Sequence, residues 1–245
     1  MQSNDYVLIT GSTSGIGHSI VLKLSREYNL ILHGRNESEL IRLRQLVPKY
    51  CDTRIFIADL NEITTLGIDF KLFLEKEKIQ VRGFIHCAGF VRILPIKHFK
   101  FEYTQQIFNI NFFSAIEIIK VLLSLVNSKK LNNVIFISAL FSKRGDKGNS
   151  VYASSKGAID TFVKSMALEL SPKVRINSVL PGAIETKMTA ELFKDKEFRS
   201  KIENEYPLGL GQVDDISNMV EFLLSDNSKW ITGQNYLVDG GRSCN

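Results

Sequence analysis

The sequence predicts an α/β protein, a doubly wound parallel sheet of about seven strands with helices on both faces. Short apolar runs alternate with longer amphipathic stretches along the chain, which is the pattern of strand and helix units around a parallel sheet. Several runs are continuously apolar rather than alternating, as expected of strands buried on both faces, and residues 7–9 and 134–137 are examples. We interpret the whole chain, residues 1–245, as one domain.

The strands are expected where the short apolar runs recur. Their ranges are 6–10, 30–33, 54–58, 83–87, 133–138, 175–180 and 235–238. A helix is expected over residues 16–28, and another begins at Tyr152. The connection from Leu180 to Val213 is too long for a simple turn and holds a helical stretch over 188–204. Residues 181–212 are therefore expected to form an excursion on the substrate side, as lids often do.

Composition excludes several classes of protein. Hydrophobic residues make up 44% and charged residues 23% of the 245 residues, which is ordinary globular usage. We expect a cytoplasmic protein without a membrane span, because no leader pattern and no apolar stretch of about 18 residues occur. The three cysteines show no CxxC spacing, so no metal site is expected. The net charge of +5 is dispersed, which favours phosphate-bearing ligands but no nucleic acid partner.

A glycine-rich loop follows the first expected strand. Its spacing is GxxxGxG, and the cofactor-binding candidates in it are Gly11, Ser12, Thr13, Ser14, Gly15, Ile16 and Gly17. Such a turn lets the backbone approach a pyrophosphate at a helix N-terminus. A tight strand-to-helix turn of any α/β protein could look similar, but the position after the first strand favours a Rossmann dinucleotide site.

The end of the second expected strand indicates which dinucleotide binds. Rossmann folds that prefer NAD carry an acidic residue there. This chain has no carboxylate between Leu32 and Asn36, whereas Arg35 can pair with a 2′-phosphate through its planar guanidinium. NADP(H) is therefore predicted in preference to NAD(H), with Arg35 and Asn36 in contact with it. The alternative is that Arg35 is only a solvated residue at the start of a helix.

Tyr152 and Lys156 are four residues apart and lie on one face of their helix. An ammonium group next to a phenol stabilises the phenolate and lowers its pKa toward working pH. That is what proton transfer to a carbonyl oxygen requires. The YxxxK pattern alone is common by chance, so its weight depends on the other motifs.

These motifs together resemble the short-chain dehydrogenase/reductase family over essentially the whole chain. The matching segments are residues 10–17, Asp59, Ala88 and Gly89, Asn111, Tyr152 and Lys156, 181–186, 231–234 and 239–241. The resemblance implies a seven-stranded sheet, a nicotinamide cofactor and hydride transfer between the cofactor and a carbonyl or secondary alcohol. It also implies a homotetramer. The branch it resembles is that of bacterial 3-oxoacyl-acyl-carrier-protein reductases, whose substrates are small or carrier-bound carbonyl compounds.

The resemblance also assigns roles to residues. Tyr152 would be the general acid in reduction and the base in oxidation, with Lys156 lowering its pKa and holding the nicotinamide ribose. Asn111 would anchor a water that relays protons, or else relieve a helix irregularity. The remaining cofactor contacts implied are Asp59, Leu60, Ala88, Gly89, Pro181, Gly182, Ile184 and Thr186. Asp59 as a helix N-cap and 181–186 as a rigid turn are the structural alternatives.

The chain departs from the family at two places. His86 and Cys87 stand where the family has two asparagines, and we expect a satisfied buried imidazole and a small hydrophobe there. Ala139 stands thirteen residues before Tyr152, where the family has its catalytic serine. Ser138 should point to the opposite face of its strand, so Ser142 in the following loop is the better candidate for a replacement hydroxyl.

The loss of the serine leaves two functions open. One is an NADP(H)-dependent ketoreductase, and the other is a catalytically impaired dinucleotide-binding homologue that acts as a sensor or assembly partner. The sequence does not decide whether the alanine is natural or introduced, nor what the substrate is. The expected pocket walls, residues 90–99, 140–150 and 186–206, mix apolar and basic side chains.

Aromatic residues give two further expectations. The phenylalanine-rich segments 70–73 and 108–113 are expected in the core or in a subunit interface rather than at a lipid surface. Trp230 is expected to pack near the last strand.

Overall fold

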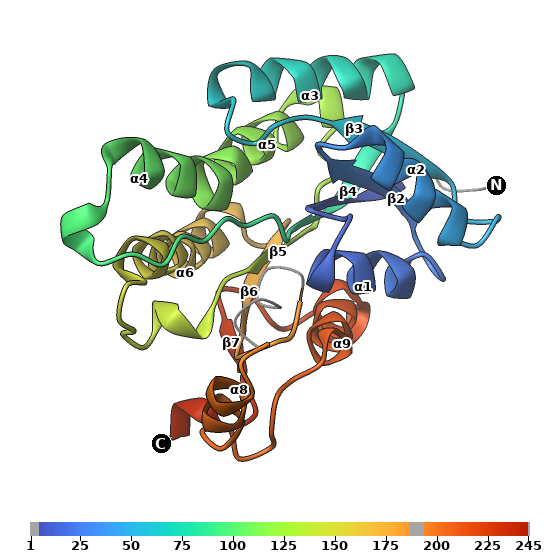
Figure 1. Ribbon diagram of the computed structural model, residues 1–245. Coiled ribbons are helices and arrows are strands. Elements are labelled where there is room, and N and C mark those ends of the chain that lie inside the picture. Colours follow the sequence, from blue (N-terminus) through green and yellow to red (C-terminus); the bar gives the residue numbers. More distant parts are fainter. Residues whose placement is uncertain (1–4, 187–193, 245) are drawn as a thin grey trace.

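The computed structural model describes residues 5–186 and 194–244. Its centre is a seven-stranded parallel sheet of order β3-β2-β1-β4-β5-β6-β7 (Figure 1). The strands are β1 (Asp5–Thr10), β2 (Asn29–Gly34), β3 (Thr53–Ile57), β4 (Gln80–His86), β5 (Asn133–Ile137), β6 (Arg175–Pro181) and β7 (Asn235–Val238). The predicted Rossmann architecture and all seven strands are confirmed. The largest change is at β4, which begins three residues earlier than expected, at Gln80.

Helices cover both faces of the sheet (Figure 1). One layer contains α1 (Gly15–Leu24), α2 (Glu37–Leu46) and α9 (Val213–Leu224). The other contains α3 (Ile63–Glu77), α4 (Phe101–Phe108), α5 (Ser114–Leu122) and α6 (Ser150–Leu170). The short helix α8 (Lys196–Glu203) belongs to the excursion between β6 and α9. Short helical turns are η1 (Ile96–His98), η2 (Asn109–Phe113), η3 (Leu125–Asn127), η4 (Leu140–Ser142), η5 (Asp226–Ser228) and η6 (Arg242–Cys244).

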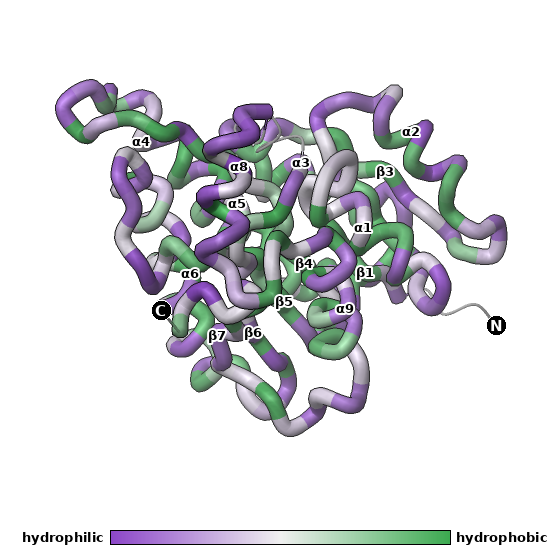
Figure 2. Tube along the Cα trace, turned by 60° about the horizontal axis from the view of Figure 1, so that its bottom comes forward, coloured by the Kyte–Doolittle hydropathy of each residue, from purple (hydrophilic) through white to green (hydrophobic). Residues whose placement is uncertain are grey.

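The central strand β1 shows why the sheet needs two helical layers. Val7, Leu8 and Ile9 are all fully buried. Successive side chains of a strand point to opposite faces, and Leu8 accordingly belongs to the core beneath α3 and α6, whereas Val7 and Ile9 belong to the core beneath α1 and α9. Each such burial contributes about 1.5 to 3 kcal/mol. Figure 2 shows the result, with hydrophobic strands inside and more hydrophilic helices around them.

Two helix limits differ from the expectation. The first helix ends at Leu24 rather than Tyr28, because the chain then forms turns. The Arg26 N–H bonds the carbonyl oxygen three residues back, and the N–H groups of Ser25 and Tyr28 bond those four residues back. The helix expected to begin at Tyr152 is α6, which starts two residues earlier, at Ser150. Of the helical stretch expected over 188–204, the described part is α8, and residues 187–193 lie outside the described residues.

The aromatic expectations are confirmed in part. Phe70 is fully buried, and Phe73 and Phe112 pack against the same core. Phe113, however, is 42% exposed, and Trp230 is 97% exposed, so the expectation that Trp230 packs near the last strand is wrong. Its neighbours in sequence do pack, since Ile231 lies against the core, but the indole itself points outward. Within the described residues, none of the helices has the length and apolar character needed to cross a membrane.

Candidate active site

The glycine-rich loop is held by close backbone approaches at the carboxyl end of β1. A Cβ on Gly11 would lie 2.8 Å from Cα of Ala88, and one on Gly17 would lie 2.2 Å from the carbonyl oxygen of Gly11. Gly11 also has a positive φ of 67°, which glycine adopts without strain. Any larger residue at these positions would push the loop away from the sheet.

The same loop leaves a helix N-terminus free for an anion. Ser12 is internal, with its N–H and hydroxyl donating to the carbonyl oxygen of His33 at 3.0 and 2.8 Å. Ser14 stands at the cap position of α1 but its side chain makes no cap hydrogen bond, and the first turn contains no acidic residue. Free N–H groups and the helix dipole favour a phosphate at such a terminus. The predicted loop therefore fits a dinucleotide pyrophosphate.

Arg35 and its neighbours lie at the carboxyl ends of β2 and β3. The Arg35 side chain is 71% exposed, and its Nη1 lies 3.9 Å from Oδ2 of Asp59. Asn36 caps α2 by accepting the N–H of Glu39. Glu62, not Asp59, occupies the cap position of α3, so the structural alternative for Asp59 is wrong, and Asp59 instead accepts the N–H of Asn61 at 2.9 Å. Leu60, beside it, is buried.

His86 links Thr10 at the end of β1 to Ile110 in the turn η2. The Thr10 hydroxyl accepts the N–H groups of Cys87 and Ala88 at 3.2 and 3.3 Å, so its proton goes to Nδ1 of His86 at 3.0 Å. Nε2 of His86 then donates to the carbonyl oxygen of Ile110 at 3.1 Å. Burial lowers the pKa of His86 to about 3, with the Lys156 ammonium acting in the same direction, so the ring is neutral. The expected satisfied imidazole is confirmed.

Asn111 lies in the π-helical turn η2, between α4 and α5. Its Oδ1 accepts the N–H of Phe90 at 2.7 Å, and its Nδ2 donates to the carbonyl oxygen of Phe90 at 3.1 Å and to Oγ of Ser155 at 2.9 Å. The carbonyl oxygen of Ile110, in the same π-helical turn, accepts hydrogen bonds from Nε2 of His86 and from the Ser114 hydroxyl. Asn111 thus joins the segment after β4 to the catalytic helix α6.

Lys156 is almost completely buried at the centre of this group. Its Nζ donates to the carbonyl oxygen of Ile137 at 2.8 Å and lies 5.8 Å from the centre of the Tyr152 ring. A Cβ on Gly89 would stand 3.6 Å from this Nζ and 3.7 Å from Oδ1 of Asn111. Burial lowers the pKa of Lys156 to about 8, although Cys87 and Asp160 act in the opposite direction. The predicted residues Gly89, Asn111, Tyr152 and Lys156 therefore come together.

Tyr152 does not show the lowered pKa that we expected from its neighbour. Burial raises the pKa of Tyr152 to about 12, and Cys87 adds to the increase. Burial disfavours the charged phenolate more than the Lys156 ammonium, 5.8 Å from the ring centre, favours it. Tyr152 is consequently a protonated phenol at neutral pH, which is the form that donates a proton.

The structure shows what surrounds the missing serine. Ala139 is 7% exposed and directly precedes η4. Ser138 donates to the backbone oxygen of Lys156 at 3.2 Å. The single hydroxyl proton of Ser142 has two acceptors in reach, the Ala139 carbonyl oxygen at 2.8 Å and Oδ2 of Asp160 at 2.5 Å. Ser142 is thereby held by Asp160, which does not support its role as the replacement donor.

Asp160 is a functional candidate that the sequence reasoning missed. It is 2% exposed, and besides Ser142 it pairs with Nζ of Lys143 at 3.0 Å. It lies one helical turn after Lys156 and raises the pKa of that residue. A carboxylate at helical spacing on the otherwise apolar side of the catalytic helix was the signal that could have identified it.

Segment 181–186 lies against the glycine-rich loop. Pro181 ends β6, and a Cβ on Gly182 would lie 2.8 Å from Cα of Asp239. Ile184 is buried and forms a bridge with Gly211. A Cβ on Gly15 would lie 3.1 Å from Cγ2 of Thr186, so the two candidate cofactor segments are in contact.

Tyr206 is a second residue that the sequence gave no reason to single out. Its hydroxyl accepts the N–H of Ala183 at 2.9 Å, which anchors the start of the excursion. As for metals, a search of residues 5–186 and 194–244 finds no group of three His, Cys, Asp or Glu side chains placed to hold an ion.

Comparison with known proteins agrees with this geometry. The family model described as "Enoyl-(Acyl carrier protein) reductase" matches residues 11–243. A tropinone reductase homologue of Arabidopsis thaliana is 28% identical, over 97% of this chain and 90% of its own length. A 3-oxoacyl-[acyl-carrier-protein] reductase of Buchnera aphidicola is 29% identical, over 96% of this chain and 95% of its own length. A 4-hydroxyisoleucine dehydrogenase solved with NADH is 26% identical and superposes with a TM-score of 0.91, over 98% and 99% of the two chains.

The fold and site define a dinucleotide-dependent oxidoreductase. The chain belongs to the short-chain dehydrogenase/reductase family, as a distant homologue of the tropinone reductase and 3-oxoacyl-acyl-carrier-protein reductase types. Its cofactor is accordingly a nicotinamide dinucleotide, NAD(H) or NADP(H).

Proposed function

We propose that the protein is an NADP(H)-dependent ketoreductase in which Tyr152 is the general acid and base. The observation that carries this proposal is the buried Lys156 beside the half-buried Tyr152 on α6, a helix joined through Asn111 and Ser155 to the segment after β4. A structural helix face would not need a buried lysine and an uncharged phenol side by side, because burying an amine costs free energy.

The chain's own residues would bind the cofactor and move the proton. Residues 11–17, Arg35, Asn36, Asp59, Leu60, Ala88, Gly89 and the 181–186 segment would hold the cofactor, which supplies or accepts the hydride. The Tyr152 hydroxyl would donate its proton to the carbonyl oxygen. The Lys156 ammonium would stabilise the phenolate that remains, since an adjacent positive charge favours the ionised phenol. Asn111 would hold the segment after β4 in register with α6.

The preference for NADP(H) rests on Arg35. It is exposed at the end of β2, where no carboxylate precedes it, and its ion pair with Asp59 is long, at 3.9 Å. We expect NADPH to bind at least tenfold tighter than NADH, a difference of about 1.4 kcal/mol. The related 4-hydroxyisoleucine dehydrogenase was solved with NADH, so NADH has to be compared with NADPH. Fluorescence titration of each cofactor measures the two dissociation constants. Equal dissociation constants, or an Arg35→Ala variant that weakens both equally, would contradict the proposal.

A second candidate function follows from Ala139, namely a dinucleotide-binding homologue with little or no turnover. The deciding experiment measures NADPH oxidation on three classes of carbonyl compound: small ketones, acyl-carrier thioesters and sugar nucleotides. Tyr152→Phe serves as the blank, and we expect it to lose at least a thousandfold in rate. Wild-type rates equal to this blank on every compound, with NADPH still bound, would favour the sensor or assembly role.

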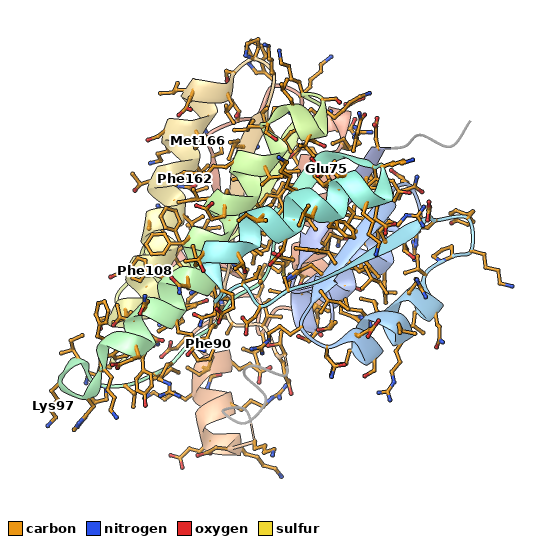
Figure 3. The ribbon with its side chains drawn as sticks, turned by 90° about the horizontal axis from the view of Figure 1, so that it is seen from above. Glu75, Phe90, Lys97, Phe108, Phe162 and Met166 are labelled. Atoms are coloured by element: carbon orange, nitrogen blue, oxygen red, sulfur yellow. The ribbon has the colours of Figure 1, made fainter. Side chains whose placement is uncertain are left out.

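We also propose that each chain folds as one cytoplasmic domain and assembles into a homotetramer. Large apolar side chains are exposed on the α4 and α6 side and beside β7, with Phe101 at 74%, Leu168 at 85% and Trp230 at 97%. Figure 3 shows Phe108, Phe162 and Met166 on the neighbouring helices α4 and α6. Exposed apolar patches of this kind mark interfaces. Light scattering that gives a monomer mass at micromolar concentration would refute the tetramer.

A further inference from the structure

Arg144 lies in the loop between η4 and α6. Its Nη1 is shut off from solvent and has no hydrogen-bond partner among the described residues. The neighbouring Lys143, by contrast, forms an ion pair with Asp160 at 3.0 Å. An unsatisfied buried donor costs about 1 to 3 kcal/mol, and more when it is charged, so its presence calls for an explanation.

The position of the loop points to the substrate side of the site. Arg144 lies five residues after Ala139 and eight before Tyr152, in the segment that follows β5. The segment that follows β4 runs beside it, because the N–H of Leu94 donates to the carbonyl oxygen of Gly148 at 3.0 Å. In open α/β sheets, ligands bind outside the carboxyl ends of the strands, which is where these two segments meet.

Among residues 5–186 and 194–244, no ion pair joins Arg144 to a carboxylate. Asp146 accepts a hydrogen bond from Nδ2 of Asn149, and Lys147 is exposed. On the adjoining segment, the Arg92 guanidinium stacks 3.8 Å above the Tyr103 ring. Basic side chains thus outnumber acidic ones in both segments, and the local potential favours an anionic ligand.

We propose that Arg144 is a specificity-determining residue that binds an oxyanion of the carbonyl substrate. The substrate class is therefore a ketone or aldehyde that carries a carboxylate or a phosphate. The planar fork of a guanidinium matches both groups with two parallel hydrogen bonds. This inference rests on the proposed ketoreductase function and names the substrate class of that same site.

The test compares charged and neutral probes of the same shape. Acetoacetate with methyl acetoacetate, and dihydroxyacetone phosphate with dihydroxyacetone, are reduced with NADPH by the wild type and by Arg144→Met. We expect the wild type to favour the anionic member of at least one pair by thirtyfold or more in kcat/KM, about 2 kcal/mol. Arg144→Met should remove that preference and change the neutral member by less than threefold. The pair that responds distinguishes carboxylate from phosphate.

Two variants control for position and for charge. Lys173→Met removes an exposed cation outside the expected pocket walls and should leave the preference unchanged, whereas Arg144→Lys should retain part of it. Arg144→Met should melt at or above the wild-type temperature, because it removes a buried Nη1 that has no hydrogen-bond partner in the described chain. Equal losses on charged and neutral probes, or no preference in the wild type for either pair, would overturn the inference.

A binding measurement separates this inference from the proposed function. Calorimetric titration of the four probes into NADPH-loaded Tyr152→Phe, with and without Arg144→Met, needs no turnover. If the wild type reduces no probe but the anionic probes bind through Arg144, then the ketoreductase proposal fails and the anion site stands. If the neutral probes bind as tightly as the anionic ones, then the anion site fails whatever the turnover is.

Discussion

The two halves of the site are built on opposite principles. On the cofactor side, the turn between β1 and α1 is shaped by missing side chains: Gly11 and Gly17 approach backbone atoms within 2.8 and 2.2 Å of where a Cβ would stand. On the catalytic side, buried polar side chains join the segment after β4, the turn η2 and helix α6. Asn111 in η2 bonds both of the other segments. The first half should be sensitive to added atoms, and the second to lost hydrogen bonds and charges.

Gly17→Ala is the strongest test of the cofactor side. Its methyl group would stand 2.2 Å from the Gly11 carbonyl oxygen, so the loop must move away from the helix N-terminus that faces the phosphates. We expect NADPH affinity to fall at least a hundredfold, measured by fluorescence titration. The matched control is Gly157→Ala on α6, whose Cβ would meet nothing within 4 Å. This control should bind NADPH normally and gain up to about 1 kcal/mol of stability, and equal affinities in the two variants would refute the contrast.

The cofactor side was also the more predictable half. Its glycines and the absence of an acidic residue near Arg35 are local patterns, and the strand and helix that flank the loop follow from apolar periodicity. Burial supplied by distant parts of the chain cannot be read in this way. The pKa of Tyr152 is raised instead of lowered because burial disfavours the phenolate, and Trp230 is 97% exposed because no segment of the described chain packs over it.

The catalytic side was predicted in its residues but not in its connections. Tyr152 and Lys156 follow from helical spacing, and Asn111 from the family resemblance. The ring of contacts around Asp160 joins Ser142, Lys143 and Ser178, which are separated from it by 17 or 18 residues in sequence and meet only through the packing of β5, α6 and β6. Such long-range contacts also explain why Ser142, which seemed free in the sequence, has its hydroxyl bound.

Ala139→Ser tests whether the catalytic side lacks one hydrogen-bond donor. A preorganised donor to the developing oxyanion typically contributes about 10² to 10³ in turnover. We expect kcat on a reduced ketone to rise at least tenfold and the NADPH dissociation constant to change by less than about threefold, a fraction of one hydrogen bond. Ser142→Ala should leave kcat within about threefold, since its hydroxyl donates to Ala139 or Asp160. The opposite pattern, loss in Ser142→Ala and no gain in Ala139→Ser, would make Ser142 the donor.

The pH dependence tests the charge on the catalytic side. The pKa of Lys156 is lowered to about 8 by burial, so the ammonium is present at pH 7 and lost as the pH rises through 8. The reduction rate should therefore be about tenfold lower at pH 9 than at pH 7, in a plot of kcat against pH. Asp160→Asn removes a carboxylate that favours the ammonium form, and the midpoint should move to lower pH. A flat profile from pH 7 to 10 would contradict this role of Lys156.

The smallest expected effect contrasts two buried histidines, one on each side. His33 ends β2 on the cofactor side: burial lowers its pKa to about 4, its Nδ1 accepts a long 3.4 Å hydrogen bond from Gly11, and its Nε2 has no partner in the described chain. His86 uses both nitrogens, on Thr10 and Ile110. A group with a missing partner loses little when an apolar residue replaces it, whereas a satisfied group leaves its partners unpaired.

We therefore expect His86→Leu to reduce the free energy of unfolding by about 1 to 3 kcal/mol, because the Thr10 hydroxyl loses its His86 acceptor and the Ile110 carbonyl oxygen loses one of its donors. His33→Leu should cost less than about 1 kcal/mol. Both are measured by urea unfolding at pH 7.5, where each ring is neutral in the folded chain and mostly neutral in the unfolded one, so protonation does not enter the difference. His86→Asn, the residue of the family pattern, should recover part of the loss, since its amide offers both a donor and an acceptor. A larger loss for His33→Leu than for His86→Leu would mean that hydrogen-bond satisfaction does not distinguish the two halves, and that packing around the rings, such as His33 on Phe56 at 5.6 Å, dominates instead.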